Sequence, residues 1–596
     1  MQPLPAVRPL RVWRLQEKLS REVALMINLT INGKQVSVAE GTTILEAARQ
    51  NGILIPTLCY LKEINEVAAC RICLVEVKGA ERLVASCNTQ VAEGMEVVTD
   101  SARVIAARRA NLALILSAHD CRCPTCVRNG NCSLQTLARN LNVLEQPYAE
   151  KVPRNAWDPN LPLVRTDSKC ISCLRCVDVC AKVQGMNVWD LLGVGRHARV
   201  GVAGGRKLTE TACTYCGQCI THCPVGALRE RDDTMKLMAA VHDPAKTVVL
   251  QVAPAVRAAW GEGLGLSPKA ATERRMAAAF RRIGVDYVFD TNFTADLTIM
   301  EEGGEFLELL KKPDRKTLFT SCCPGWVRFL KHEYPDLVSQ LSSAKSPQQM
   351  FGAVTKTYFA QKLGKDPKDV FCVSVMPCTA KKWECDVEAV NSAGAGKDVD
   401  LVLTTREVDR LLNVLSVNVC ALPEEDFDSP LGTGSGAGVI FGATGGVMEA
   451  ALRTAYAIVE GRNPEPDAFR AVRGLDGRKE LTVTLGGKEI RACVASGLGN
   501  ARKVVEDLRA GRVHYDFVEI MACPGGCTGG GGQPIFDGCE LAGERGETLY
   551  ALDKSNALRF SHENPSVKAL YAESLEKPLS HKAHELLHTN QQEWRL

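Results

Sequence analysis

Hydrophobic and polar residues follow two patterns along the chain, and the change between them near residue 245 divides it into two halves. In residues 26–39 apolar and polar positions alternate on both sides of Asn32-Gly33, a favoured sequence of tight hairpin turns. Gly41 and the two threonines after it open an amphipathic helix, and residues 103–118 carry a second helical pattern. The first half therefore predicts small α+β domains.

In the second half, short apolar runs alternate with longer stretches of helical periodicity. Alternating strands and helices are typical of an α/β domain with parallel sheets, where sites form beyond the carboxyl ends of strands. The runs that predict buried strands are residues 248–252, 287–289, 316–320, 370–376, 400–404 and 517–521.

Length and charge exclude several classes of function. A chain of 596 residues has room for about four domains of roughly 150 residues each. Its 72 basic and 69 acidic residues leave a net charge of +3, which gives no support to nucleic-acid binding. No apolar run approaches the roughly 18 residues of a membrane span, so no membrane role is expected. Residues 1–25 mix charges and lack a sustained apolar stretch, which predicts an N-terminal extension and not a signal peptide.

The 26 cysteines point to metal chemistry. They are bunched in Cys-x2-Cys spacings, which suit metal centres better than disulfides between distant elements. Because no secretion signal accompanies them, we expect a reducing, cytoplasmic location.

The first cysteine group follows the predicted hairpin and helix. This order resembles the β-grasp of plant-type [2Fe–2S] ferredoxins, although ten residues instead of four separate the first two cysteines. It looks like the variant at the front of hydrogenases and of the large iron–sulfur subunit of respiratory complex I, which implies one [2Fe–2S] cluster in residues 26–104. A four-cysteine zinc site is the alternative. The implied ligands are Cys59, Cys70, Cys73 and Cys87.

A His-x3-Cys-x2-Cys-x5-Cys run comes next, with Cys121 between its members as a spare thiol. Its residue types alone leave zinc and an iron–sulfur cluster open. Directly behind a [2Fe–2S] pattern, it resembles the [4Fe–4S] segment with one histidine and three cysteine ligands of the same two families, here in residues 105–160. The implied ligands are His119, Cys123, Cys126 and Cys132.

Two copies of Cys-x2-Cys-x2-Cys-x3-Cys lie 43 residues apart, and Pro224 follows the second. In bacterial ferredoxins with two [4Fe–4S] clusters, the fourth cysteine of each such run binds the other cluster. We therefore predict a 2[4Fe–4S] ferredoxin-like domain in residues 161–240. One cluster is assigned to Cys170, Cys173, Cys176 and Cys223, and the other to Cys213, Cys216, Cys219 and Cys180.

Three more cysteine motifs lie just beyond predicted strands, at residues 320–326, 376–381 and 521–527. Together with the Gly-Gly-Gly-Gly-Gln-Pro run that follows the third, they resemble the signature segments of the [FeFe]-hydrogenase catalytic domain. The resemblance extends from about residue 26 to the end. It looks closest to catalytic subunits of multi-subunit NAD(P)-linked, electron-bifurcating enzymes. It implies a catalytic domain over residues 241–543 and a small-subunit-like tail over residues 544–596.

The resemblance also implies an H-cluster. In that centre a [4Fe–4S] cluster is joined through a cysteine to a two-iron subcluster with CO, cyanide and azadithiolate ligands. Splitting H2 needs an open Lewis-acidic metal and a neighbouring base, which the iron and the azadithiolate amine provide. The implied ligands of the cluster are Cys323, Cys378, Cys523 and Cys527, of which Cys527 also bridges to the subcluster.

A second set of residues is implied to move protons and to hold the subcluster. Glu302 and Glu305 are spaced to share one face of a helix, where a solvated acidic surface is the alternative. Ala255 stands where some members of the family have serine. The implied proton relay is Cys322, Glu302, Glu305 and Ser342, and Lys381 matches the lysine that hydrogen-bonds a cyanide. Residues implied to surround the subcluster are Met376, Met521, Ser346, Gln348 and Glu384.

No Gly-x-Gly-x-x-Gly run opens a βαβ unit, so we expect nicotinamide and flavin on other chains. The resemblance implies an NAD(P)H-binding flavoprotein, small [2Fe–2S] subunits and ferredoxin as partners, with H2 and protons as substrates. Two other functions compete: an iron–sulfur assembly or electron-relay protein, and a complex I-like subunit. The relay residues argue against the first, and the catalytic cysteines argue against the second.

Overall fold

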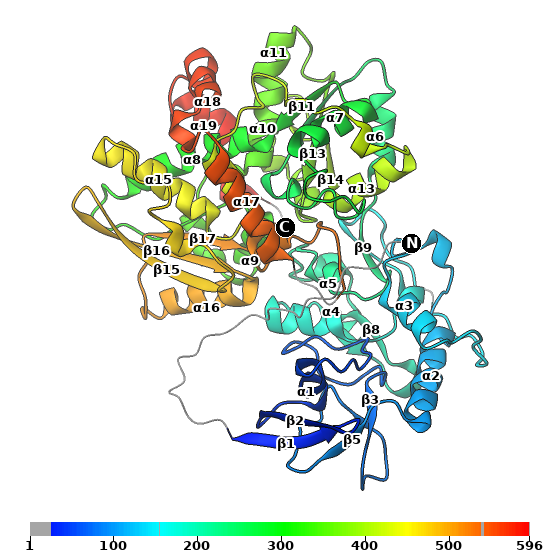
Figure 1. Cartoon of the computed structure of the whole chain (residues 1–596). Coiled ribbons are helices and arrows are strands. Elements are labelled where there is room, and N and C mark those ends of the chain that lie inside the picture. The colour runs from blue at the N-terminus through cyan, green and yellow to red at the C-terminus, as the bar shows by residue number, and fades with distance from the viewer. Residues whose placement is uncertain (1–24, 154, 538–540, 595–596) are drawn as a thin grey trace.

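The computed structural model describes residues 25–153, 155–537 and 541–594, and it arranges small modules beside a large catalytic unit (Figure 1). Apart from Leu25, the predicted N-terminal extension lies outside the described residues. Helices run across three of the predicted domain borders, at 104/105, 240/241 and 543/544. These helices are α2 (Ala102–Ser117), α6 (Thr234–Val241) and α17 (Ala542–Ser555).

The first module is a five-stranded sheet with one helix. β1 (Met26–Ile31) and β2 (Lys34–Ala39) form the predicted antiparallel hairpin, and Asn32 and Gly33 take the positive φ of its turn. β5 (Glu96–Val98) pairs parallel to β1, which gives the strand order β2-β1-β5-β3-β4. The other elements are α1 (Ile44–Gln50), β3 (Leu74–Val77) and β4 (Val84–Ala85).

The two cysteine repeats lie in a module between the first one and the catalytic unit (Figure 1). Its ends are joined by β6 (Leu163–Arg165) and β9 (Leu228–Glu230), which pair antiparallel and bring the two repeats side by side. Its remaining elements are α4 (Arg175–Asp178), β7 (Trp189–Leu192), β8 (Arg199–Val202) and α5 (Gln218–Thr221). The helix α3 (Ser133–Asn140) precedes this module.

The catalytic unit contains two four-stranded sheets, ordered β11-β10-β13-β14 and β12-β17-β16-β15. The first is wholly parallel, as predicted. The second ends in an antiparallel hairpin, β15 (Arg478–Leu485) and β16 (Lys488–Ser496). The sequence did not predict this hairpin, because one face of β15 is largely exposed and polar and gives no apolar run. The strand predicted at 316–320 is only β12 (Leu318–Phe319). The other strands are β10 (Thr247–Val252), β11 (Tyr287–Asp290), β13 (Val370–Met376), β14 (Leu401–Thr404) and β17 (Phe517–Met521).

A long buried helix, α8 (Thr291–Leu309), begins where β11 ends and packs against α10 (Pro347–Val354) and α15 (Gly446–Glu460). The tail, red in Figure 1, returns to this helix: α18 (Pro565–Leu570) contacts α8, and α19 (His581–Leu587) contacts α10. Further helices are α7 (Glu273–Ile283), α9 (Pro324–Glu333), α11 (Ala360–Leu363), α12 (Lys381–Glu384), α13 (Thr405–Val414), α14 (Gly436–Ile440) and α16 (Leu498–Arg509).

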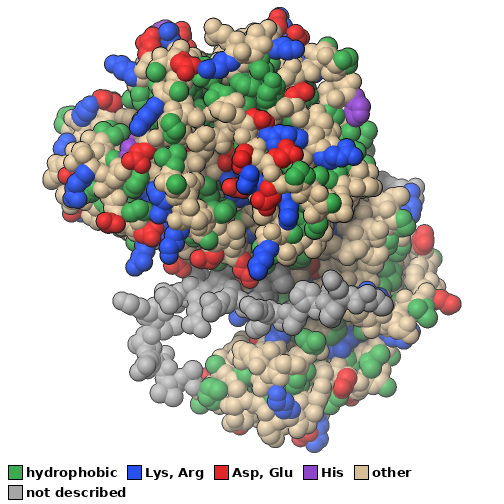
Figure 2. All heavy atoms as spheres, turned by 45° about the horizontal axis from the view of Figure 1, so that its top comes forward, with side chains coloured by type: hydrophobic (Ala, Val, Ile, Leu, Met, Phe, Trp, Pro, Cys, Tyr) green, Lys and Arg blue, Asp and Glu red, His purple; other side chains and the backbone are tan. Residues whose placement is uncertain are grey.

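Charges of both signs are interspersed over the face that Figure 2 presents. This agrees with the nearly equal numbers of basic and acidic residues in the sequence. Among the described helices, none combines the length and the apolar character needed to cross a bilayer.

Candidate functional site

The first cysteine group is a buried cluster of four thiols in the N-terminal module. Each of the four is at most 9% exposed, and none of the described cysteines forms a disulfide. The thiol of Cys59 donates a hydrogen bond to Cys70 and lowers its pKa, and Cys87 does the same for Cys73. The same hydrogen bonds, together with burial, raise the pKa of the donors Cys59 and Cys87, so the four sulfurs lie in two close pairs. The residues present therefore fit a cluster at this position.

His119, a predicted cluster ligand, is buried just beyond the carboxyl end of α2. Burial lowers its pKa to about 4, so the ring is neutral, and its Nδ1 has no hydrogen-bond partner. A neutral imidazole with a free nitrogen is a metal-binding form. Arg128 Nη1 donates to the carbonyl of Cys223 at 2.8 Å, which joins this segment to the ferredoxin-like module.

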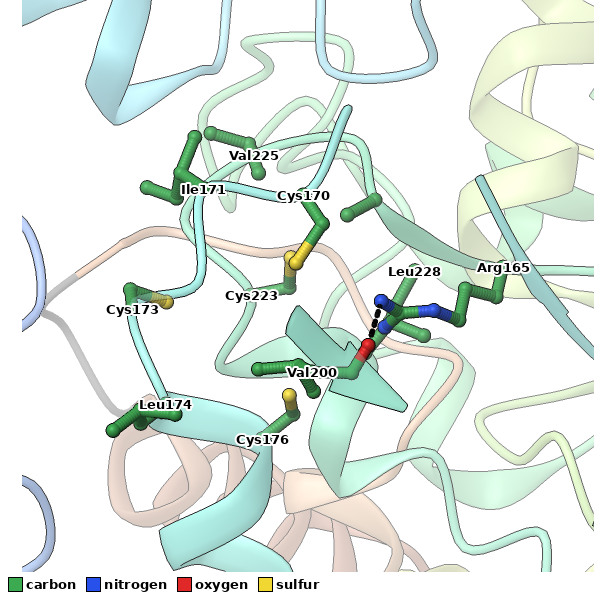
Figure 3. Close-up of a pocket in the computed structure, with 11 residues that line it drawn as sticks. Arg165, Cys170, Ile171, Cys173, Leu174, Cys176, Val200, Cys223, Val225 and Leu228 are labelled. Atoms are coloured by element: carbon green, nitrogen blue, oxygen red, sulfur yellow. Dashed lines mark hydrogen bonds between the residues drawn. The ribbon is translucent and has the colours of Figure 1, made fainter. Parts of the chain in front are cut away.

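The two cysteine repeats surround two separate cavities. Cys170, Cys173 and Cys176 share the first cavity with Cys223 from the other repeat, and Figure 3 shows their thiols turned toward the space between them. The second cavity is lined by Cys213, Cys216, Cys219 and the crossing Cys180. The structure thus brings together the two exchanged sets that the spacing predicted.

The loops around these cavities share one backbone conformation. Ser172 and Leu174 in the first repeat, and Tyr215 and Gly217 at the same offsets in the second, all have positive φ. A left-handed residue next to a right-handed one turns successive backbone N–H groups into a concave loop that stabilises negative charge. Among the described residues, no three His, Cys, Asp or Glu side chains converge closely enough for one metal ion.

The second cavity abuts the catalytic unit. The thiol of Cys523 lies 3.8 Å from the carbonyl oxygen of Cys216 and donates to it. The Thr379 hydroxyl donates to Tyr215 O at 2.6 Å, and Gln218 Nε2 donates to Gly529 O at 2.9 Å. Direct hydrogen bonds therefore connect the loop that lines the second cavity with the loops that carry the catalytic cysteines.

The four catalytic cysteines come from both sheets. Cys323 caps the start of α9, Cys378 follows β13, and Cys523 and Cys527 follow β17. Burial raises the pKa of all four thiols, and the charges of neighbouring cysteines raise it further at Cys378, Cys523 and Cys527. Four converging thiols that resist ionisation need a bound metal to be stable as thiolates, which fits a cluster.

Glycines let the motif loops touch. Gly530 leaves only 2.1 Å between the position of a Cβ and Pro377 O, and Gly532 N–H donates to the same carbonyl at 2.8 Å. A side chain at Gly530 would force apart the loops that carry Cys378 and Cys527. This is the physical reason for the glycine run after the third motif.

Lys381 lies at the centre of a buried polar group. Its Nζ donates to Glu384 Oε2 at 2.8 Å and to the carbonyl of Cys322 at 3.1 Å. Burial alone would lower its pKa, but the charge of Glu384 outweighs this and raises it, so the ammonium is retained. Ser346 and Gln348 donate to the same oxygen of Glu384, at 3.0 and 3.2 Å.

The predicted methionines lie at the ends of strands beside this group. Met376 ends β13 and Met521 ends β17, and both are 3% exposed. Ala255 is fully buried next to Gly442. Each of these three side chains is buried in an apolar cluster, where water is excluded.

The predicted relay residues are also brought together. Glu302 is fully buried on α8, where it accepts the Ser321 N–H at 3.3 Å, and Ser342 donates to Glu305 at 2.6 Å. A solvated acidic face is therefore wrong for Glu302. Burial, and then the charge of Glu305, raises the pKa of Glu302 to about 8, and burial with the charge of Glu302 raises that of Cys322. Both groups can thus carry a proton near neutral pH.

Three residues beside this relay were missed by sequence reasoning: Glu301, Ser343 and His588. The Ser343 hydroxyl donates to Glu305, and His588 lies between Glu301 and Glu305. The one signal in the sequence was the adjacent pair Glu301-Glu302, because neighbours on a helix point in different directions and each buried carboxylate needs its own partner. The partner of Glu301 is far away in sequence.

Comparison with known families matches the chain in five segments. Residues 246–531 match the iron only hydrogenase large subunit, C-terminal domain, and residues 540–593 the iron hydrogenase small subunit. Residues 24–102 match a 2Fe-2S iron-sulfur cluster binding domain. Residues 108–147 match the NADH-ubiquinone oxidoreductase-G iron-sulfur binding region, and residues 162–229 the ferredoxin-like domain of NADH-quinone oxidoreductase subunit 3. The fold and these matches define an iron–sulfur oxidoreductase.

Several proteins resemble the chain over most of its length. NADP-reducing hydrogenase subunit HndD of Solidesulfovibrio fructosivorans is 47% identical, covering 95% of this chain and 98% of the relative. Iron hydrogenase 1 of Clostridium pasteurianum is 38% identical, covering 94% and 99%. The apo [FeFe]-hydrogenase HydA1 of Chlamydomonas reinhardtii superposes with a TM-score of 0.55 at 44% identity, covering 60% of this chain and 98% of that one. The chain belongs to the [FeFe]-hydrogenase family.

A more distant relative is cytosolic iron-sulfur assembly component 3 of Bos taurus, 31% identical over 66% of this chain and 87% of the relative. The two hydrogenases match both more of the chain and at higher identity. The chain is accordingly an [FeFe]-hydrogenase oxidoreductase, with iron–sulfur cluster domains before its catalytic domain.

Proposed function

We propose that this chain interconverts H2 with protons and electrons as the catalytic subunit of an NAD(P)-linked complex. The observation that carries the proposal is the continuous arrangement on either side of the catalytic cysteines. On one side the Cys523 thiol contacts the second ferredoxin cavity. On the other, the Lys381 group contacts Cys322, and Glu302, Ser342 and Glu305 lead away from it. An electron route and a proton route thus meet at one place.

The cofactors proposed are one [2Fe–2S] cluster, three accessory [4Fe–4S] clusters and an H-cluster, held by the cysteines and the histidine assigned above. When bound, the two-iron subcluster with its CO, cyanide and azadithiolate ligands supplies a Lewis-acidic iron and a base. The four proposed domains that carry the cluster ligands, residues 26–104, 105–160, 161–240 and 241–543, follow one another along the chain, which supports a series of clusters.

The residues of this chain would hold and protonate that centre. Lys381 presents a cation beside Cys322, and Glu384 fixes it with the help of Ser346 and Gln348. The Cys322 thiol would exchange a proton with the centre on one side and with the Glu302 carboxyl on the other. Ser342 and Glu305 would then carry the proton outward.

Electrons are proposed to reach the N-terminal clusters from an NAD(P)H-binding flavoprotein and small [2Fe–2S] subunits, with ferredoxin as a further carrier. Support comes from the relative named as a subunit of an NADP-reducing hydrogenase, which matches almost the whole chain. Further support comes from residues 108–147 and 162–229, which match iron–sulfur regions of NADH-quinone oxidoreductases and precede the catalytic domain.

The direct test is an infrared spectrum together with an assay of hydrogen turnover. Protein produced with the hydrogenase maturation machinery should show bands of metal-bound CO and cyanide and should evolve H2 with a reduced dye. Cluster-loaded protein with neither property would contradict the proposal and would favour an assembly or relay function.

The exchange of the fourth cysteines can be tested by counting iron in double variants. Cys170→Ala with Cys223→Ala removes two ligands of one cavity, so about four iron atoms should be lost. Cys170→Ala with Cys180→Ala disturbs both cavities and should lose about eight. Cys121→Ala, at an exposed spare thiol, should lose none. The reverse order of the two double variants would show that each repeat binds its own cluster.

A further inference from the structure

The end of the chain is built into the segment that carries the relay serine. Residues 587–589 run antiparallel to residues 343–345: Lys345 N donates to Leu587 O at 2.9 Å, and Thr589 N donates to Ser343 O at 2.8 Å. Gln591 Nε2 also donates to the carbonyl of Ser342 at 3.0 Å. The tail therefore helps to fix the backbone of residues 342–345.

The same tail places one side chain between two glutamates of α8. His588 is 4% exposed at its side chain, with Nε2 2.9 Å from Glu301 Oε2 and Nδ1 3.4 Å from Glu305 Oε1. The Ser343 hydroxyl is 2.7 Å from Nδ1 and bridges to Glu305. Glu305 is the outermost of these carboxylates, since its side chain is 17% exposed. Ser342 contacts its other oxygen.

The charges around His588 favour an imidazolium. Burial alone would lower its pKa, but hydrogen bonds to Glu301 and Glu305 raise it to about 9. Burial likewise opposes ionisation of Glu305, but hydrogen bonding to His588 and Ser342 lowers its pKa below the ordinary value.

Other titratable groups face this cluster from the neighbouring elements. Glu302 of α8 adds negative charge beside Glu305. The ring of His584 on α19 lies 4.2 Å from that of His588, and burial together with the charge of His588 lowers its pKa, which keeps it neutral. Tyr571 donates to Glu301, and the ammonium of Lys345 is paired with Asp398 at 3.6 Å. The cation that faces both glutamates is thus His588.

We propose that His588 is a positioning residue of the proton path, whose imidazolium holds Glu305 as an oriented carboxylate at the outer end. The proposal rests on the hydrogen chemistry proposed above. During H2 oxidation the carboxyl of Glu302 passes its proton to the Ser342 hydroxyl, while the hydroxyl's own proton passes to Glu305 and then to solvent. His588 keeps both of its protons throughout. The small-subunit-like tail therefore completes the path.

The test is the pH dependence of H2 oxidation in the His588→Gln holoenzyme. Without the cation, burial and the charge of Glu302 raise the pKa of Glu305. Its carboxyl then stays protonated up to a higher pH, and while protonated it cannot accept a proton from Ser342. The acidic limb of the profile should move up by at least one pH unit, which is about a tenfold loss of rate on that limb. In His588→Gly, added imidazole should move the limb back.

Tyr571→Phe is the matched control. It removes a hydrogen bond between the tail and Glu301 without touching Glu305, so the acidic limb should stay in place. An equal shift in Tyr571→Phe, or an unshifted limb in His588→Gln, would overturn the proposal.

A second measurement separates this proposal from the proposed function. The carboxyl bands of Glu305, identified by difference from Glu305→Gln, can be titrated by infrared spectroscopy in protein without the two-iron subcluster. The titration should move to higher pH in His588→Gln, whether or not the protein turns over hydrogen. An unchanged titration would refute the role of His588, whereas inactive wild-type protein without CO and cyanide bands would refute only the hydrogen chemistry.

Discussion

Cys322→Ser is expected to lower hydrogen turnover by at least about 100-fold while the infrared bands of CO and cyanide persist. The Cys322 thiol lies between the Lys381 group and the Glu302 carboxyl, where both neighbours set its proton affinity. Serine has nearly the same shape, but its hydroxyl gives up a proton far less readily than a thiol. Turnover with a reduced dye and an infrared spectrum of the same sample measure the two effects separately.

Cys493→Ser provides the matched control. Cys493 is also a fully buried thiol, on β16, but it is neither a predicted cluster ligand nor a predicted relay residue. It should keep turnover close to that of the wild type. Wild-type turnover in Cys322→Ser would remove this residue from the relay. Loss of the CO and cyanide bands in Cys322→Ser would mean that the thiol holds the centre in place.

Lys382→Met is expected to destabilise the protein by about 3–5 kcal/mol. Lys382 is fully buried, and its ammonium lies 2.7 Å from Asp233 and 3.0 Å from Glu407, which are also fully buried. Removing the cation leaves the buried Glu407 carboxylate without its ion-pair partner, whereas Asp233 keeps Arg231 and Lys236. Because Asp233 precedes α6 and Glu407 lies on α13, the effect should appear as earlier separation of these elements during denaturation.

Lys236→Met is the control, because Lys236 pairs with the same Asp233 at 2.8 Å but its side chain is 62% exposed. It should cost less than about 1 kcal/mol. Denaturant midpoints are the appropriate comparison, since a chain of several modules does not unfold in one step. Equal midpoints for the two variants would show that the buried cation is not needed at this joint.

Much of the fold was predictable because local patterns agreed with tertiary contacts. The strands at 370–376 and 517–521 were predicted correctly, since each is a short apolar run, and the Asn32-Gly33 turn was correct because this dipeptide favours a tight hairpin. The β15–β16 hairpin was not predictable from apolar runs, because half of β15 faces solvent.

The candidate site divides in the same way. The spacing of the cysteines within each repeat is local information. It was therefore enough to predict that Cys223 lines the cavity of the first repeat and that Cys180 lines the cavity of the second. The contact of His588 with Glu301 joins residues 287 positions apart, and no local pattern encodes it. Nor did the sequence indicate that Lys382, next to Lys381, is a buried structural cation.

The pairing of residues 587–589 with residues 343–345 has a consequence for biosynthesis. Ser343 and His588 are 245 positions apart, so at about 5–20 residues per second a ribosome needs about 12–50 seconds to make the second after the first. During that interval the nascent catalytic domain can collapse around its sheets, but the strip that carries Ser342 has no edge partner from the tail. Until residues 587–589 have been made, cofactor insertion during synthesis would therefore meet an incompletely closed protein.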